Sequence, residues 1–112
     1  MKILICGAGS IGTRHAKNLI ALKHNVAFHT KRKNSPIKNV LCFKKLTDAF
    51  VKFKPEITYI TNVTSLHIKT ALYAAKKNSA IFIEKPLTNK KTNVKKLVNI
   101  IKKKKLLTWS DI

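Results

Sequence analysis

The segment KILICGAGSIGTRH, residues 2–15, decides how the rest of the sequence is interpreted. Its first part, Lys2–Cys6, is a nearly continuous apolar run, which predicts a buried β-strand. Three glycines follow at the spacing G-x-G-x-x-G, namely Gly7, Gly9 and Gly12. This pattern alone is weak evidence for a ligand site, because it also suits a tight turn with no ligand. Its meaning depends on the elements that surround it.

Apolar strand patterns and amphipathic helix patterns alternate along the whole chain. Such an alternation implies right-handed βαβ crossovers and a parallel sheet. The strand segments are apolar almost throughout, as expected when helices cover both faces of a sheet. We expect a doubly wound, Rossmann-like α/β fold, with residues 1–112 as one dinucleotide-binding domain. The expected strands are 2–6, 25–30, 40–43, 57–61, 80–83 and one that starts at 106; the expected helices are 10–23, 46–53 with Thr47 as cap, 65–78 and 89–105.

The glycine segment lies between the first expected strand and the first expected helix, which is the context that a dinucleotide motif requires. Gly7 would permit the tight turn, and Gly9 would let the backbone approach a pyrophosphate. Gly12 would let the helix pack close to the strand. The backbone N–H groups of Ser10, Ile11 and Gly12 would point at a phosphate from the helix N-terminus.

The end of the second expected strand indicates which cofactor is preferred. An acidic residue there would bind the ribose 2′-hydroxyl of NAD. This chain instead has Thr30, Lys31 and Arg32, a hydroxyl followed by cations. These groups suit a 2′-phosphate, so the sequence favours NADP over NAD. The alternative is that the basic residues form a solvated loop in a lysine-rich protein.

The charge of the chain is unusual for its size. There are 24 Lys and Arg residues against 4 Asp and Glu, which gives a formal net charge of +20 over 112 residues. A surface of this kind attracts nucleic acids and other polyanions. However, Arg14 and Arg32 are the only arginines, whereas nucleic-acid readers usually depend on arginine. The alternative explanation of the charge is genome composition, because an AT-rich genome favours lysine, asparagine and isoleucine at positions that tolerate substitution.

Other features of the composition narrow the class of protein. Cys6 and Cys42 lie in apolar strand segments and are expected to be buried, reduced and inert. We expect no metal site, because ligands at metal-binding spacing are missing. The sequence has no apolar run long enough for a membrane span and no export signal, so a cytoplasmic protein is expected.

Two stretches resemble a known family. ITYITNVTSLHIKTALYAAKKNSAIFIEKPLT, residues 57–88, resembles the signature region of the Gfo/Idh/MocA oxidoreductases, and KILICGAGSIGTRHAKNL, residues 2–19, resembles the start of the same proteins. The glycine loop, an N-x-x-x-x-H segment and an E-K-P motif occur in the family's order. The resemblance covers all of the chain and is more specific than the glycine pattern alone.

The resemblance implies an NAD(P)-dependent dehydrogenase that acts on sugars or sugar derivatives, and it implies further site residues. Asn62 and Val63 match the turn that passes the ribose and nicotinamide, although relatives often have proline at the position of Val63. His67 matches a histidine that opens the next helix, where a structural role is the alternative. Glu84 would lie near the nicotinamide ribose, and Lys85 would face the substrate and assist hydride or proton transfer.

Members of this family have a second domain that supplies most of the substrate pocket, and residues 1–112 are not expected to include it. The chain is therefore expected to be incomplete as an enzyme, either cut from a longer gene or completed by a separate chain that supplies the missing domain. A non-catalytic dinucleotide binder or a truncated remnant is the first alternative. A basic module that binds nucleic acid or another polyanion is the second.

Overall fold

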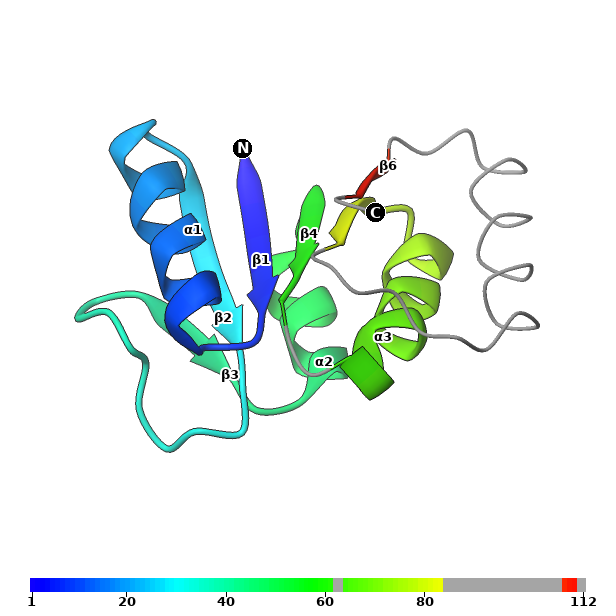
Figure 1. The fold of residues 1–112 in the computed structure, drawn as a ribbon, viewed down its shortest axis with the longest axis horizontal. Helices are drawn as coiled ribbons and strands as arrows, with labels where there is room; N and C mark the ends of the chain where they lie inside the picture. Colours follow the sequence, from blue (N-terminus) through cyan, green and yellow to red (C-terminus); the bar gives the residue numbers. More distant parts are fainter. Residues whose placement is uncertain (62–63, 84–107, 111–112) are drawn as a thin grey trace.

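The structure is a computed structural model that describes residues 1–61, 64–83 and 108–110 (Figure 1). The strands are β1 (Lys2–Cys6), β2 (Asn25–His29), β3 (Leu41–Phe43), β4 (Ile57–Ile60), β5 (Ala80–Ile83) and β6 (Thr108–Ser110). The helical elements are α1 (Ser10–Ala21), α2 (Leu46–Asp48), the π-helical turn η1 (Ala49–Phe53) and α3 (Thr64–Lys76). The expected helix at 89–105 lies outside the described residues.

These strands form a six-stranded sheet in the order β3-β2-β1-β4-β5-β6. Every neighbouring pair is parallel. The strand order reverses between β1 and β4, because the chain moves outward from β1 to β3 and then returns to the middle of the sheet to begin β4. This order is that of a doubly wound Rossmann sheet, so the predicted fold class is confirmed.

Two hydrophobic clusters lie on the two faces of the sheet. One cluster joins Leu4 and Ile60 to the helical residues Phe50 and Ala71, on the face that α2, η1 and α3 cover. The other joins Ile5 and Phe28 to Ala16 of α1 on the opposite face. In Figure 1 the sheet accordingly runs between α1 on one side and α3 on the other. Residues of β1 enter both clusters in alternation, so this strand is buried on both faces.

The segment that follows β3 differs from the prediction. Helix α2 begins at Leu46 with Lys45 as its N-cap, and no side chain makes a cap hydrogen bond. Thr47 therefore lies inside the first turn, and its predicted capping role is wrong. The expected continuous helix changes to the π-helical turn η1 after Asp48. Lys54 then adopts a left-handed conformation with φ 52° before Pro55, which disfavours a further helical turn.

Both cysteines are free, but they differ in burial. Cys6 lies fully inside the sheet, whereas Cys42 on the outer strand β3 is only half-buried, so the expected burial holds fully for Cys6 alone. Burial raises the pKa of the Cys6 thiol far above its usual range. In the part of the chain that the structure describes, no helix has the length and hydropathy needed to cross a membrane.

The turn from β1 into α1 requires glycine at two positions. Gly7 has a φ of 109°, in a region that residues with a side chain rarely adopt. At Gly12 an added Cβ would collide with the carbonyl oxygen of Gly7 and would lie 2.8 Å from Thr61 Oγ1. Helix α1 therefore packs against the end of β1 with no space for a side chain, as the glycine pattern predicted.

We predict that Gly12→Ala destabilises the protein. At an open helix position this exchange would stabilise by about 1 kcal/mol. Here the new methyl group must displace backbone, which typically costs about 1–3 kcal/mol. Urea unfolding measures the difference.

Gly9→Ala is the matched control, because nothing lies within 4 Å of a Cβ at Gly9. Its free energy of unfolding should change by less than about 1 kcal/mol. Equal stability of the Gly12→Ala variant and the original chain would contradict the close packing of α1.

Candidate functional site

The candidate site lies at the carboxyl ends of the parallel strands, where the strand order reverses between β1 and β4. Ligands of open α/β sheets bind outside this point, because the crossovers on either side leave a crevice there. Thr61, directly after β4, joins the two strands: its backbone N–H donates to Cys6 O at 2.9 Å. Its hydroxyl donates to Cys6 O at 3.1 Å and to Gly7 O at 3.2 Å. The backbone N–H of Gly7 donates to His29 O of β2 at 2.9 Å. The glycine loop is thus held from both sides.

Helix α1 begins at this loop with free backbone donors. Gly9 is its N-cap, and the first turn has neither a side-chain cap nor an acidic residue. The backbone N–H of Thr13 donates to Gly9 O at 2.9 Å, which is the first bond of the helix. The N–H groups of Ser10, Ile11 and Gly12 therefore precede the helical hydrogen-bond pattern. They form the positive end of the helix dipole, where anions bind.

A pocket of about 460 Å³ opens beside this helix start. Its volume lies within the range of about 300–1,000 Å³ that is usual for small-molecule sites. Its lining comes from the glycine loop, from the first turns of α1 and from the segment after β2: Ala8, Gly9, Ser10, Thr13, Arg14, Lys17 and Arg32. The pocket therefore joins the loop predicted to bind a pyrophosphate to the segment predicted to face a ribose.

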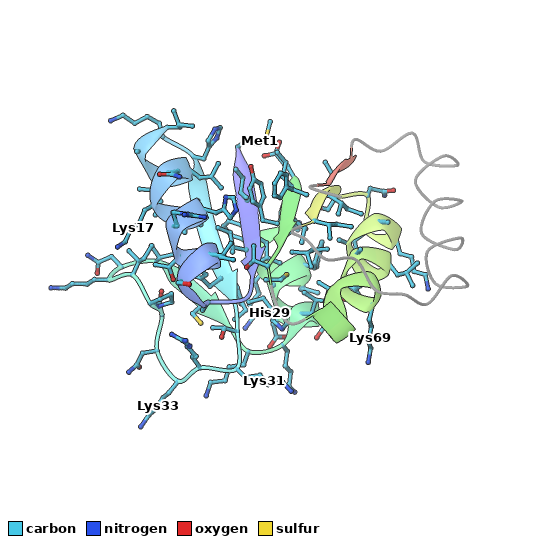
Figure 2. The ribbon with its side chains drawn as sticks, in the orientation of Figure 1. Met1, Lys17, His29, Lys31, Lys33 and Lys69 are labelled. Atoms are coloured by element: carbon cyan, nitrogen blue, oxygen red, sulfur yellow. The ribbon has the colours of Figure 1, made fainter. Side chains whose placement is uncertain are left out.

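The residues after β2 are placed differently from one another. The hydroxyl of Thr30 accepts a hydrogen bond from the backbone N–H of Arg32 at 3.2 Å, which turns the chain after β2. Both Lys31 and Arg32 are exposed, and of the two only Arg32 lines the pocket. Figure 2 shows Lys31 and Lys33 on the loop that follows β2. Of the predicted cations at this position, Arg32 is the one that the fold directs to the pocket.

Three polar pocket residues were missed by the motif, namely Thr13, Arg14 and Lys17. They lie three, four and seven residues after Ser10, so they share one face of α1 with it. That spacing is visible in the sequence. Which face of the helix meets the pocket, however, follows from how α1 packs on the sheet.

The other predicted residues either are not among the pocket lining or lie outside the described residues. Ile11, in the glycine loop, is exposed beside it with a relative accessibility of 45%. His67 belongs to α3, but the structure does not describe its side chain. Asn62, Val63, Glu84 and Lys85 lie outside the described residues.

His29 ends β2 next to the glycine loop and has an unusual environment (Figure 2). Its Nδ1 atom is buried and has no hydrogen-bond partner among the described residues. Burial lowers the pKa of His29, and the charge of Lys31 acts in the same direction, while a hydrogen bond to the Lys44 backbone opposes them. The neutral imidazole is therefore the form that the fold favours.

The sequence was compared with protein families and with solved structures. Residues 1–111 match the family model described as "Oxidoreductase family, NAD-binding Rossmann fold". Among curated proteins, no sequence matches this chain significantly.

Several solved dehydrogenases share the fold. Myo-inositol 2-dehydrogenase from Lactobacillus plantarum is 22% identical and has a TM-score of 0.88, with 98% of this chain and 35% of the enzyme covered. A probable dehydrogenase from Thermotoga maritima is 22% identical, with a TM-score of 0.87 and coverage of 99% and 36%. The WlbA dehydrogenase from Bordetella pertussis, solved with NADH and UDP-GlcNAcA, is 14% identical, with a TM-score of 0.82 and coverage of 95% and 35%. This chain thus spans about 35% of the length of such enzymes.

We predict that His29 makes the protein less stable in mild acid. The folded state lowers the pKa of His29, so the unfolded chain binds more protons below the ordinary value of 6.5. Stability is therefore complete above that value and falls as the pH decreases toward the lowered pKa of the folded state.

Urea unfolding of the original chain and of a His29→Gln variant between about pH 5 and 7.5 tests this, since the window brackets the ordinary histidine pKa. The original chain should lose more stability on acidification than the variant. Parallel pH curves for the two proteins would show that His29 does not contribute.

Proposed function

Because the chain belongs to the Gfo/Idh/MocA oxidoreductase family, we propose that residues 1–112 form a dinucleotide-binding domain that serves hydride transfer. The substrate would be the hydroxyl or carbonyl group of a sugar or sugar derivative. The observation that carries this proposal is the uncapped N-terminus of α1, which opens at the sheet's reversal point beside a cation-lined pocket. A nicotinamide dinucleotide, when bound, supplies or accepts the hydride.

The residues of the glycine loop would hold the pyrophosphate of the cofactor. The free N–H groups of Ser10, Ile11 and Gly12 are donors with a fixed direction, and they lie at the positive end of α1. At Gly9 a ligand could approach the backbone closely, since no atom lies within 4 Å of the Cβ position. Thr61 fixes the loop through Gly7, so the donors are positioned before the ligand arrives.

The segment Thr30–Arg32 would select the cofactor. It offers a hydroxyl and two cations, and no carboxylate to bind a ribose 2′-hydroxyl. A 2′-phosphate suits these groups better, so NADP is proposed over NAD. The Bordetella pertussis dehydrogenase, which shares this fold, was solved with NADH.

The residues of the chemical step are proposed from motifs that this chain shares with the family, above all E-K-P. Lys85 would hold or deliver a proton at the reacting oxygen of the substrate, as a general acid–base. Glu84, Asn62 and Val63 would line the nicotinamide ribose, and His67 would complete the turn around it. Since this chain spans about 35% of the solved dehydrogenases, we propose that further polypeptide, in the same or a separate chain, completes the substrate pocket.

We predict that the purified chain binds NADPH in a saturable manner, more tightly than NADH, and that binding persists at high salt. Nicotinamide fluorescence measures both affinities over a salt series. The salt series is essential, because a chain of net charge +20 attracts any phosphate compound through charge that salt screens. Binding that disappears with salt would favour the polyanion-binding alternative.

The variant Gly9→Leu makes this test specific. Its side chain enters open space, so the protein should fold, yet it occupies the place proposed for the pyrophosphate. Affinity for both cofactors should fall at least about 100-fold, since a close backbone approach is lost. Unchanged binding by a folded Gly9→Leu protein would overturn the proposed dinucleotide site.

A further inference from the structure

Both arginines of this protein line the same pocket. The chain has 24 basic residues, of which Arg14 and Arg32 are the only arginines. Arg14 belongs to α1 and Arg32 to the segment after β2, and the two line the pocket together with Lys17. A bias toward lysine over the whole surface does not account for arginine at two separate positions that the fold brings together.

The pocket is built so that these cations surround one space. The backbone of Ala8, Gly9 and Ser10 forms one part of the lining. Arg14 and Lys17, one helical turn apart on α1, lie on one side, and Arg32 approaches from the other segment. The turn that Thr30 stabilises through the backbone of Arg32 sets the direction of that segment. Among the described residues that line the pocket, none is acidic.

Chemistry narrows the ligand group that this arrangement would bind. A guanidinium presents a planar set of donors that pairs with two oxygens of a phosphate, whereas lysine acts as a point charge. A terminal phosphate carries nearly two negative charges and three acceptor oxygens. Two arginines from separate segments, with a lysine in the same lining, match such a group better than a bridging phosphate diester, which has fewer free oxygens.

We propose that Arg14, together with Arg32, forms a two-arginine clamp for the 2′-phosphate of the cofactor, and that Arg14 is a specificity-determining residue for NADP. The proposal rests on the proposed dinucleotide-binding function. According to this proposal, α1 binds the ribose phosphate in addition to the segment after β2. Lys17 supplies additional positive charge at the same side of the pocket.

The experiment compares Arg14→Gln and Arg14→Lys with the original chain. Arg14 is exposed, so both variants should fold, and urea unfolding checks this. At high salt, Arg14→Gln should weaken NADPH binding by roughly 10- to 100-fold, the size expected for hydrogen bonds to a charged group. Affinity for NADH should stay within about twofold, since screened long-range charge contributes little there. Arg14→Lys should be intermediate, because it keeps the charge and loses the paired donors.

The control variant is Lys69→Gln, which removes an exposed charge from α3, away from the pocket (Figure 2). It should leave both affinities unchanged. A second control is the ligand itself: 2′,5′-ADP and 3′,5′-ADP have the same charge and differ in the position of one phosphate. The 2′ isomer should compete more strongly with NADPH, and Arg14→Gln should reduce the difference, since Arg32 remains.

Each outcome decides between the proposals. If the original chain binds neither cofactor at high salt, the dinucleotide function fails and the clamp fails with it. If both cofactors bind but Arg14→Gln weakens them equally or not at all, the function stands and the clamp is overturned. Equal competition by the two ADP isomers would also overturn the clamp, and full NADPH affinity in Arg14→Lys would overturn its paired hydrogen bonds.

Discussion

The close contact between α1 and the end of β1 is the constraint on which the site depends. Gly12 leaves no room for a side chain between the helix and the carbonyl of Gly7, and Thr61 binds that same carbonyl from β4. The N-terminus of α1 is thereby fixed over the point where the sheet reverses its strand order. Because two parallel strands and a helix meet at one peptide, the direction of the free N–H groups is set by the packing of the core. Binding geometry and folding are thus determined together here.

The sequence predicted most of the fold because each strand is a short apolar run between clear turn signals. The central strands, buried on both faces, are the clearest case, and β1 has the bounds that its sequence predicted. The helix after β3 is the contrast. Its apolar positions predicted a helix, but the change to a π-helical turn at Ala49 and the cap at Lys45 follow from how Phe50 and Phe53 reach the core. These details depend on tertiary packing, which no local sequence pattern indicates.

The candidate site could be predicted in part for a similar reason. The glycine loop is a local motif, so its conformation could be inferred from spacing alone. Arg14 and Lys17 are not part of the glycine motif, and their place at the pocket depends on which face of α1 points to it. The prediction also weighted Lys31 and Arg32 equally, whereas in the structure both are exposed and only Arg32 lines the pocket. A side chain's direction depends on the backbone turn, and composition cannot supply it.

The residues of the proposed site fall into two groups along the chain, those that line the pocket and those proposed for the chemical step. All of the residues that line the pocket come from the first βαβ unit, β1-α1-β2, and the segment directly after it. The residues proposed for the chemical step follow β4 and β5 in the sequence. The phosphate recognition proposed above thus rests on residues of the first unit and of the segment after it. Arg14 and Arg32, the residues proposed to select the cofactor, are therefore far in the sequence from Lys85, the residue proposed for proton transfer. In a parallel sheet the strands present separate loops at one edge, so one fold can carry sites for different ligands on different loops. In this chain the glycine turn holds α1 at that edge, because Gly12 and Thr61 fix it against the end of β1.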